Sequence, residues 1–97
     1  MDTHEDTPLY APIERVQIGV RMEKRMVKVL KGLAEYHDLT LGDLLEGIVL
    51  HAFESRLPFH EGSLRKIAQL KDVYGMNYGV EASHRLTEIA PKKEEQK

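Results

Sequence analysis

The sequence contains no cysteine, so neither a disulfide nor a thiolate metal site can stabilise the fold. It also has no apolar run near the ~18 to 20 residues that a membrane-spanning helix requires. Its first residues, MDTHEDTPLY, are acidic, whereas a secretory signal peptide is basic and then apolar. These absences predict a cytoplasmic protein with no membrane partner.

Sequence motifs for catalysis are also missing. No nucleophile and base pairing, phosphate-binding loop or paired-carboxylate pattern is visible, so we expect no enzyme activity. Among the histidines, the best metal-binding set is His51 with Glu54 one helical turn later and His60 beyond the proline. That spacing fixes no third ligand, so we predict neither a metal nor another cofactor.

One segment has the pattern of a β-strand. Residues 15–22, RVQIGVRM, alternate apolar and polar side chains, which is the period of a strand. The rest of the chain offers no second strand of this quality, and a lone strand leaves both of its edges unpaired in water. A chain of 97 residues is near the size at which oligomerisation is a common source of stability. We therefore predict a homodimer in which a second copy supplies the missing strand.

The charges are segregated along the chain, although the net charge is only −2. Residues 1–14 hold acidic side chains and no lysine or arginine, whereas residues 15–31 hold six basic residues opposed by Glu23 alone, a net charge of +5. The basic residues of this second segment are Arg15, Arg21, Lys24, Arg25, Lys28 and Lys31. Such a concentrated positive field attracts phosphate and favours nucleic-acid binding. The alternative is an ordinary solvated helix face that carries lysines.

Two helices are predicted after the strand. The first runs from Glu23 to about Tyr36, and Gly32 weakens it by about 1 kcal/mol relative to alanine. The second begins at Thr40, the expected N-cap, and cannot continue through Pro58. Its residues repeat with the spacing of one broad apolar face, made by Leu41, Leu44, Leu45, Ile48, Val49, Ala52 and Phe53.

A third helix is predicted from Ser63 to Tyr74, and Gly75 is a natural stop. Its expected inward residues are Leu64, Ile67, Ala68, Leu70 and Val73. The following segment, MNYGVEASHRLTEI, is ambiguous between a loop and a short helix. A pocket or a small core could be lined there by Tyr74, Tyr78, His84 and Arg85. The predicted division is a flexible arm (1–13), a DNA-binding and dimerisation domain (14–56), a helical extension (57–90) and a charged tail (91–97).

The order of one alternating strand, a basic helix, a capping threonine and an apolar helix resembles the ribbon-helix-helix family, the Arc/MetJ type of bacterial repressor. The resemblance covers about residues 15–54. It implies a mainly α fold with one short strand per chain, paired antiparallel in a homodimer, here with a C-terminal helical extension. It further implies a transcriptional repressor whose two-stranded β-ribbon enters the major groove of double-stranded DNA and binds it sequence-specifically.

The resemblance also assigns site residues. Base contacts fall on the outward residues Gln17, Gly19 and Arg21, although a glycine has no side chain with which to read a base. Phosphate contacts fall on basic side chains and on the start of the second helix, whose amides suit an anion: Arg15, Lys24, Arg25, Lys28, Thr40, Leu41 and Gly42. The dimer core is assigned to Val16, Ile18, Val20, Leu41, Leu44, Leu45, Ile48, Val49 and Phe53.

Two alternative functions remain open at this stage. In the first, the chain is an antitoxin: the same dimer binds DNA, while the segment after Pro58 wraps a toxin protein. A C-terminal half that is disordered in the free protein favours this alternative, whereas a packed third helix favours a stand-alone regulator. In the second, the chain is a dimeric interaction module that does not bind DNA.

Overall fold

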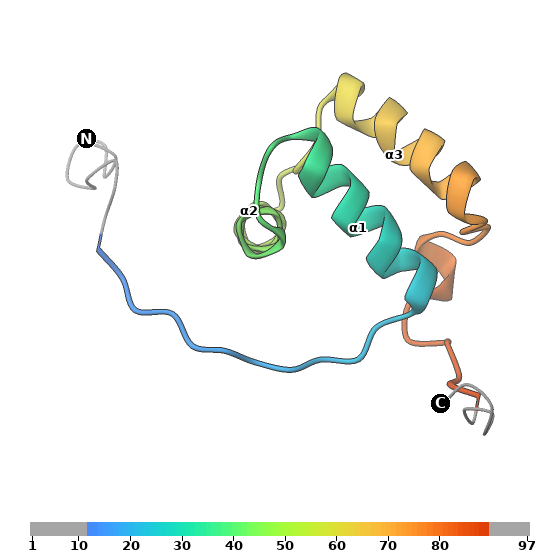
Figure 1. The fold of residues 1–97 in the computed structure, drawn as a ribbon, viewed down its shortest axis with the longest axis horizontal. Helices are drawn as coiled ribbons and strands as arrows, with labels where there is room; N and C mark the ends of the chain where they lie inside the picture. Colours follow the sequence, from blue (N-terminus) through green and yellow to red (C-terminus); the bar gives the residue numbers. More distant parts are fainter. Residues whose placement is uncertain (1–11, 90–97) are drawn as a thin grey trace.

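The computed structural model describes residues 12–89 and has three α-helices and one short 3-10 helix in this range. The helices are α1 (Lys24–Tyr36), α2 (Leu41–Phe53), α3 (Glu61–Tyr74) and η2 (Val80–Ala82). In Figure 1, α3 lies alongside α1 and runs in the opposite direction, while α2 crosses them and is seen end-on. The charged tail predicted for residues 91–97, and all but the last two residues of the predicted arm, lie outside the described range.

The β-strand predicted for residues 15–22 is not present, and this part of the fold prediction is wrong. Residues 12–23 follow an extended path that contains neither helix nor strand, and no strand occurs anywhere in residues 12–89 (Figure 1). The side chains expected to face the helices are instead exposed: Val16 by 84%, Ile18 by 74% and Val20 by 68%.

The physical reason is that alternation reports only a local preference. It favours an extended backbone with two unlike faces, but a strand also needs a neighbouring backbone with which to exchange hydrogen bonds. In the described part of the chain no such neighbour lies beside residues 15–22. The mainly α class is consistent with the structure, and the antiparallel ribbon of a ribbon-helix-helix fold is not.

The helix boundaries follow local capping chemistry. Glu23 is the N-cap of α1, since its carboxylate accepts hydrogen bonds from the amides of Arg25 and Met26 at 3.1 and 3.2 Å. Thr40 caps α2 as predicted, because its hydroxyl accepts from the amide of Asp43 at 3.1 Å. The helix predicted from Glu23 thus begins one residue later, and the third helix begins two residues before Ser63.

The three α-helices end in the same way. After each helix one residue adopts the left-handed conformation, and two amides donate back to the last turn in a Schellman motif. At the end of α1, the amides of Asp38 and Leu39 donate to the carbonyls of Glu35 and Ala34 at 3.1 and 2.9 Å. The left-handed residues are Asp38 (φ 60°), Ser55 (φ 58°) and Gly75 (φ 70°). Gly75 is the predicted stop, and the other two positions adopt this conformation without a glycine.

A small core lies where the three helices meet. Its centre is formed by Leu33, Ala34 and Leu44, and the half-buried side chains packed on them are Leu30, Ile48, Phe59, Ile67 and Leu70. Ile67 and Leu70 of α3 were predicted to face inward, and they do. The same prediction is wrong for three others, because α3 buries only a narrow face against α1: Leu64, Ala68 and Val73 are exposed.

Two contacts hold α3 on α1. A Cβ atom on Gly32 would lie 2.9 Å from Cδ2 of Leu70, so the glycine that weakens α1 also lets the two helices approach closely. At the other end of the pair, the Ser63 hydroxyl is buried and lies 2.9 Å from Nε2 of His37. The interface between α1 and α3 is therefore specified by both packing and a hydrogen bond.

The C-terminal part of the apolar face of α2 is uncovered. Leu44 is the one residue of this helix that is buried, whereas Val49, Leu50 and Phe53 are exposed by 44%, 64% and 79%. Leu57, which follows the helix, is 86% exposed. Of the α2 side chains predicted to form a dimer core, Val49 and Phe53 are thus exposed, whereas Leu44 is buried and Leu41, Leu45 and Ile48 are half-buried.

Candidate nucleic-acid interface

Three exposed lysines form a row along α1. Lys24, Lys28 and Lys31 are spaced by four and three residues, so they lie on one side of the helix and span about 10 Å along its axis. Within residues 12–89 none of the three makes an ion pair, although the Lys28 ammonium lies 5.6 Å from the centre of the Tyr74 ring. We call these three residues the lysine row.

The arginines of the same segment are paired with carboxylates of the chain. Arg15 donates to both carboxylate oxygens of Glu46 on α2, at 3.0 and 2.9 Å, and this hydrogen bonding lowers the pKa of the Glu46 carboxyl. Arg21 makes a similar two-pronged contact with Glu88 near the C-terminal end of the described chain. All four side chains are largely exposed to solvent.

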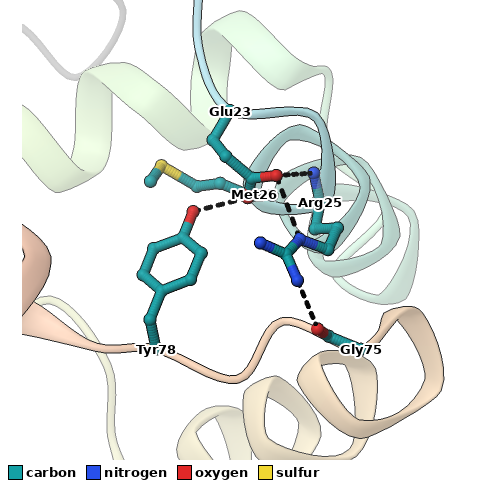
Figure 2. A network of polar contacts seen from close by, with 5 residues as sticks. All are labelled: Glu23, Arg25, Met26, Gly75 and Tyr78. Carbon is teal, nitrogen blue, oxygen red and sulfur yellow. Dashed lines mark hydrogen bonds and ion pairs between the residues drawn. The ribbon is translucent and has the colours of Figure 1, made fainter. Parts of the chain in front are cut away.

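A network at the start of α1 joins Glu23, Arg25, Gly75 and Tyr78 (Figure 2). The Arg25 side chain donates to Glu23 Oε2 at 3.0 Å and to the Gly75 carbonyl at 2.9 Å. The Tyr78 hydroxyl donates to Glu23 Oε1 at 2.5 Å, and the Arg25 guanidinium lies 5.6 Å from the centre of the Tyr78 ring. The network thereby fixes the chain that follows α3 against the first turn of α1.

Both ionisable partners at the centre of this network have shifted pKa values. Burial raises the pKa of Glu23, but the hydrogen bonds from Tyr78, Arg25 and the Met26 amide outweigh it and lower that pKa to about 2. Burial and the hydrogen bond to Glu23 raise the pKa of Tyr78 to about 12. At neutral pH a carboxylate therefore accepts from a neutral phenol, and the contact is a charge-assisted hydrogen bond.

The phosphate site predicted at the start of α2 lies at the beginning of a separate helix from the lysine row. Thr40 caps the helix, Leu41 is half-buried and Gly42 is exposed, next to the exposed carboxylate of Asp43. These residues follow the end of α1, so Lys31 is the member of the lysine row that lies nearest to them along the helix axis.

The predicted base-contacting residues lie on the extended segment. Gln17 and Gly19 are exposed, and nothing lies within 4 Å of a Cβ built on Gly19. Arg21 is occupied by Glu88. Since residues 15–22 have no partner strand, backbone pairing does not hold these three residues on a common face.

The structure also contains a shallow apolar pocket of about 330 Å³ beside the Glu23 network. Met26, Met76, Tyr78, Val80 and Leu86 line it. Tyr78 was among the four residues predicted to line a pocket. The other three, Tyr74, His84 and Arg85, do not line this pocket. Its walls offer apolar side chains and no cluster of reactive groups.

No metal-binding set is found in residues 12–89, since nowhere there do three histidine, aspartate or glutamate side chains come together. Nδ1 of His51 lies 2.7 Å from the Gly47 carbonyl of the preceding turn. None of the helices in this range has both the length and the apolar character needed to cross a membrane.

Sequence reasoning missed the carboxylates that hold the arginines. Glu23 was read as the first residue of a helix, and neither Glu46 nor Glu88 had any signal that joined it to a basic residue. Tyr78 lies 55 residues from Glu23 in the chain, and no local pattern predicts such a contact. No protein family model, curated protein or solved structure matches this chain.

Proposed function

We propose that this chain is a cytoplasmic, homodimeric protein that binds double-stranded DNA through the basic surface of residues 15–31 and regulates transcription. The proposal gives it no catalytic role and does not use a paired β-ribbon. The observation that carries it is the lysine row, three exposed cations on one side of α1 that are not neutralised by carboxylates of the described chain.

The dimensions of the lysine row suit a DNA backbone. A rise of about 10 Å along one DNA strand contains several phosphates at 3.4 Å each, so the three flexible lysine side chains can reach neighbouring phosphates. Lysine is a flexible point charge that binds phosphate without base preference, so the row supplies affinity rather than sequence information. A dimer presents two such rows and doubles the local positive charge.

The homodimer is supported by the apolar surface of α2. The chain buries a core of few residues while it exposes Val49, Leu50 and Phe53, which helical spacing places close together on α2. Contiguous exposed apolar surface of this kind marks an interaction site. A second copy is the occupant we propose, because α2 carries acidic residues but no lysine or arginine, and docking there leaves both lysine rows uncovered.

The packing of α3 supports a stand-alone regulator over an antitoxin. A segment that folds only when it wraps a toxin loses its conformational entropy on binding, so it is unfolded in the free protein. Here Ile67 and Leu70 of α3 pack on the core, and Ser63 is buried beside His37. The chain after Pro58 already has a folded partner in α1.

The test is the binding of lysine variants to a random-sequence duplex, followed by fluorescence anisotropy. At about 0.1 M salt each lost phosphate contact should weaken binding by roughly tenfold, because one condensed counterion is no longer released. In the proposed homodimer each substitution removes two contacts, so Lys24→Ala and Lys28→Ala should each weaken binding by roughly a hundredfold. Lys66→Ala removes the same charge from α3, where the ammonium lies 4.8 Å from the Tyr36 ring centre, and should have little effect.

Equal losses in all three variants would show that binding follows total charge and not the lysine row. Absence of binding by the unmodified chain at low salt would leave the dimeric interaction module as the better account. Dimerisation has a separate readout, since sedimentation should give twice the chain mass at micromolar concentration. A compact monomer at that concentration would contradict the homodimer.

A further inference from the structure

The chain that follows α3 returns to the basic segment. Figure 1 shows it leaving the end of α3 and passing the start of α1, and Figure 2 shows two of its residues in contact there. Gly75 accepts a hydrogen bond from Arg25, and Tyr78 donates one to Glu23. We call residues 75–89 the C-terminal strap.

The strap ends with a carboxylate on a proposed DNA-contacting arginine. The two oxygens of Glu88 accept from Nε and Nη2 of Arg21, which lies 67 residues earlier in the chain. This two-pronged geometry is the one in which an arginine binds a phosphate or the acceptor edge of guanine. Arg21 and Glu88 remain 79% and 60% exposed, so a competing anion can reach the guanidinium.

We infer that the C-terminal strap is an autoinhibitory element in which Glu88 occupies Arg21 and competes with DNA for it. The inference rests on the proposed function. The Glu23 network anchors the strap near its beginning, and this raises the local concentration of Glu88 at Arg21. Free duplex must displace the carboxylate to use Arg21, whereas the lysine row stays available without any movement.

The expected effect is modest, because an exposed ion pair is weak and solvent screens it. Glu88→Gln should tighten duplex binding about two- to fivefold. The matched control is Glu81→Gln, which removes one negative charge from the same strap, but from a carboxylate that accepts from the Gly79 amide at 2.8 Å. The control should tighten binding less than Glu88→Gln does.

The decisive comparison uses the Arg21→Ala background. If Glu88 acts by occupying Arg21, the gain from Glu88→Gln should disappear there. An equal gain in both backgrounds, or no gain beyond that of Glu81→Gln in the unmodified chain, would overturn the inference.

A second measurement is independent of DNA and separates this inference from the proposed function. The side-chain Nε–H signal of Arg21 in a nuclear magnetic resonance spectrum should shift in Glu88→Gln and not in Glu81→Gln. An unchanged signal would overturn the strap contact itself. If the signal shifts but the unmodified chain and Glu88→Gln both fail to bind duplex, the contact exists and the proposed function is wrong.

Discussion

Replacing Tyr78 of the C-terminal strap by phenylalanine removes the hydroxyl that contacts the N-cap of α1 and keeps the aromatic ring beside Arg25. The hydroxyl donates to Glu23, whose other hydrogen bonds cap the helix and hold Arg25 (Figure 2). Tyr78→Phe therefore leaves the N-cap in place and weakens only the link between α1 and the C-terminal strap. We expect a less stable protein with an unchanged fold.

The magnitude follows from the pKa of Glu23. A fall from 4.5 to about 2 corresponds to at most ~3.5 kcal/mol, at about 1.4 kcal/mol per unit. Several donors share this effect, and the side chain stays 22% exposed, so solvent screening reduces it further. A hydrogen bond to a charged group contributes about 1.5 to 3 kcal/mol. We expect Tyr78→Phe to lower the free energy of unfolding by about 1 to 2 kcal/mol at pH 7.

The pH dependence has a definite sign. A carboxyl whose pKa is lower in the folded protein stabilises the fold above its ordinary pKa, and this stabilisation is lost as the pH falls from about 4.5 toward 2. A phenol whose pKa is higher in the folded protein stabilises the fold below pH 10, and this is lost as the pH rises toward 12. The difference between Tyr78→Phe and the unmodified chain should thus be largest between pH 4.5 and 10.

The assay is urea unfolding of both proteins across this pH range at one protein concentration. Tyr74→Phe is the matched control, because the Tyr74 hydroxyl makes no hydrogen bond within residues 12–89. The control should stay within about 0.5 kcal/mol of the unmodified chain. A constant difference from pH 2 to pH 7, or none at all, would refute the role of the Glu23 carboxylate.

Three further substitutions test the packing and the dimer. Ser55→Gly should raise the free energy of unfolding by about 1 kcal/mol in denaturant unfolding, because Ser55 has φ 58° and glycine adopts that conformation without a steric cost; a loss of stability would contradict the helix end described. Gly32→Ala should destabilise the unmodified chain but stabilise a Leu70→Ala chain by up to about 1 kcal/mol, because the three atoms nearest to the new Cβ all belong to Leu70; equal effects in both would exclude the clash. Phe53→Ala should weaken the concentration dependence of thermal unfolding, because Phe53 is 79% exposed in the single chain and is buried only by the proposed second copy; an unchanged dependence would place the interface elsewhere.

Features set by local chemistry were predictable from the sequence. Thr40 as an N-cap and Gly75 as a helix stop are encoded within a few residues, and both predictions are confirmed. The strand predicted for residues 15–22 is absent, because the alternation of apolar and polar residues does not supply a neighbouring backbone. The prediction that Leu64 and Val73 face inward is wrong. The helical period shows which side of a helix is apolar but not how much of that side a neighbouring helix covers.

The candidate site was also predictable only in the features that are local in sequence. The positive charge of residues 15–31 is visible in the sequence, and the exposure of the lysine row follows from helical spacing. The pairs between Arg21 and Glu88 and between Glu23 and Tyr78 join residues far apart in the chain, so only the fold reveals them. The base-contacting role of Gln17, Gly19 and Arg21 stays a prediction, without the strand that was to orient them.

The salt dependence of duplex binding tests the central proposal most directly. If two lysine rows in a dimer neutralise six phosphates, the logarithm of the association constant should fall with the logarithm of salt concentration with a slope of about −5. The combined variant Lys24→Ala, Lys28→Ala and Lys31→Ala should reduce the slope to between 0 and about −1. A slope that is already near zero in the unmodified chain, or one that the combined variant leaves unchanged, would contradict DNA binding through the lysine row.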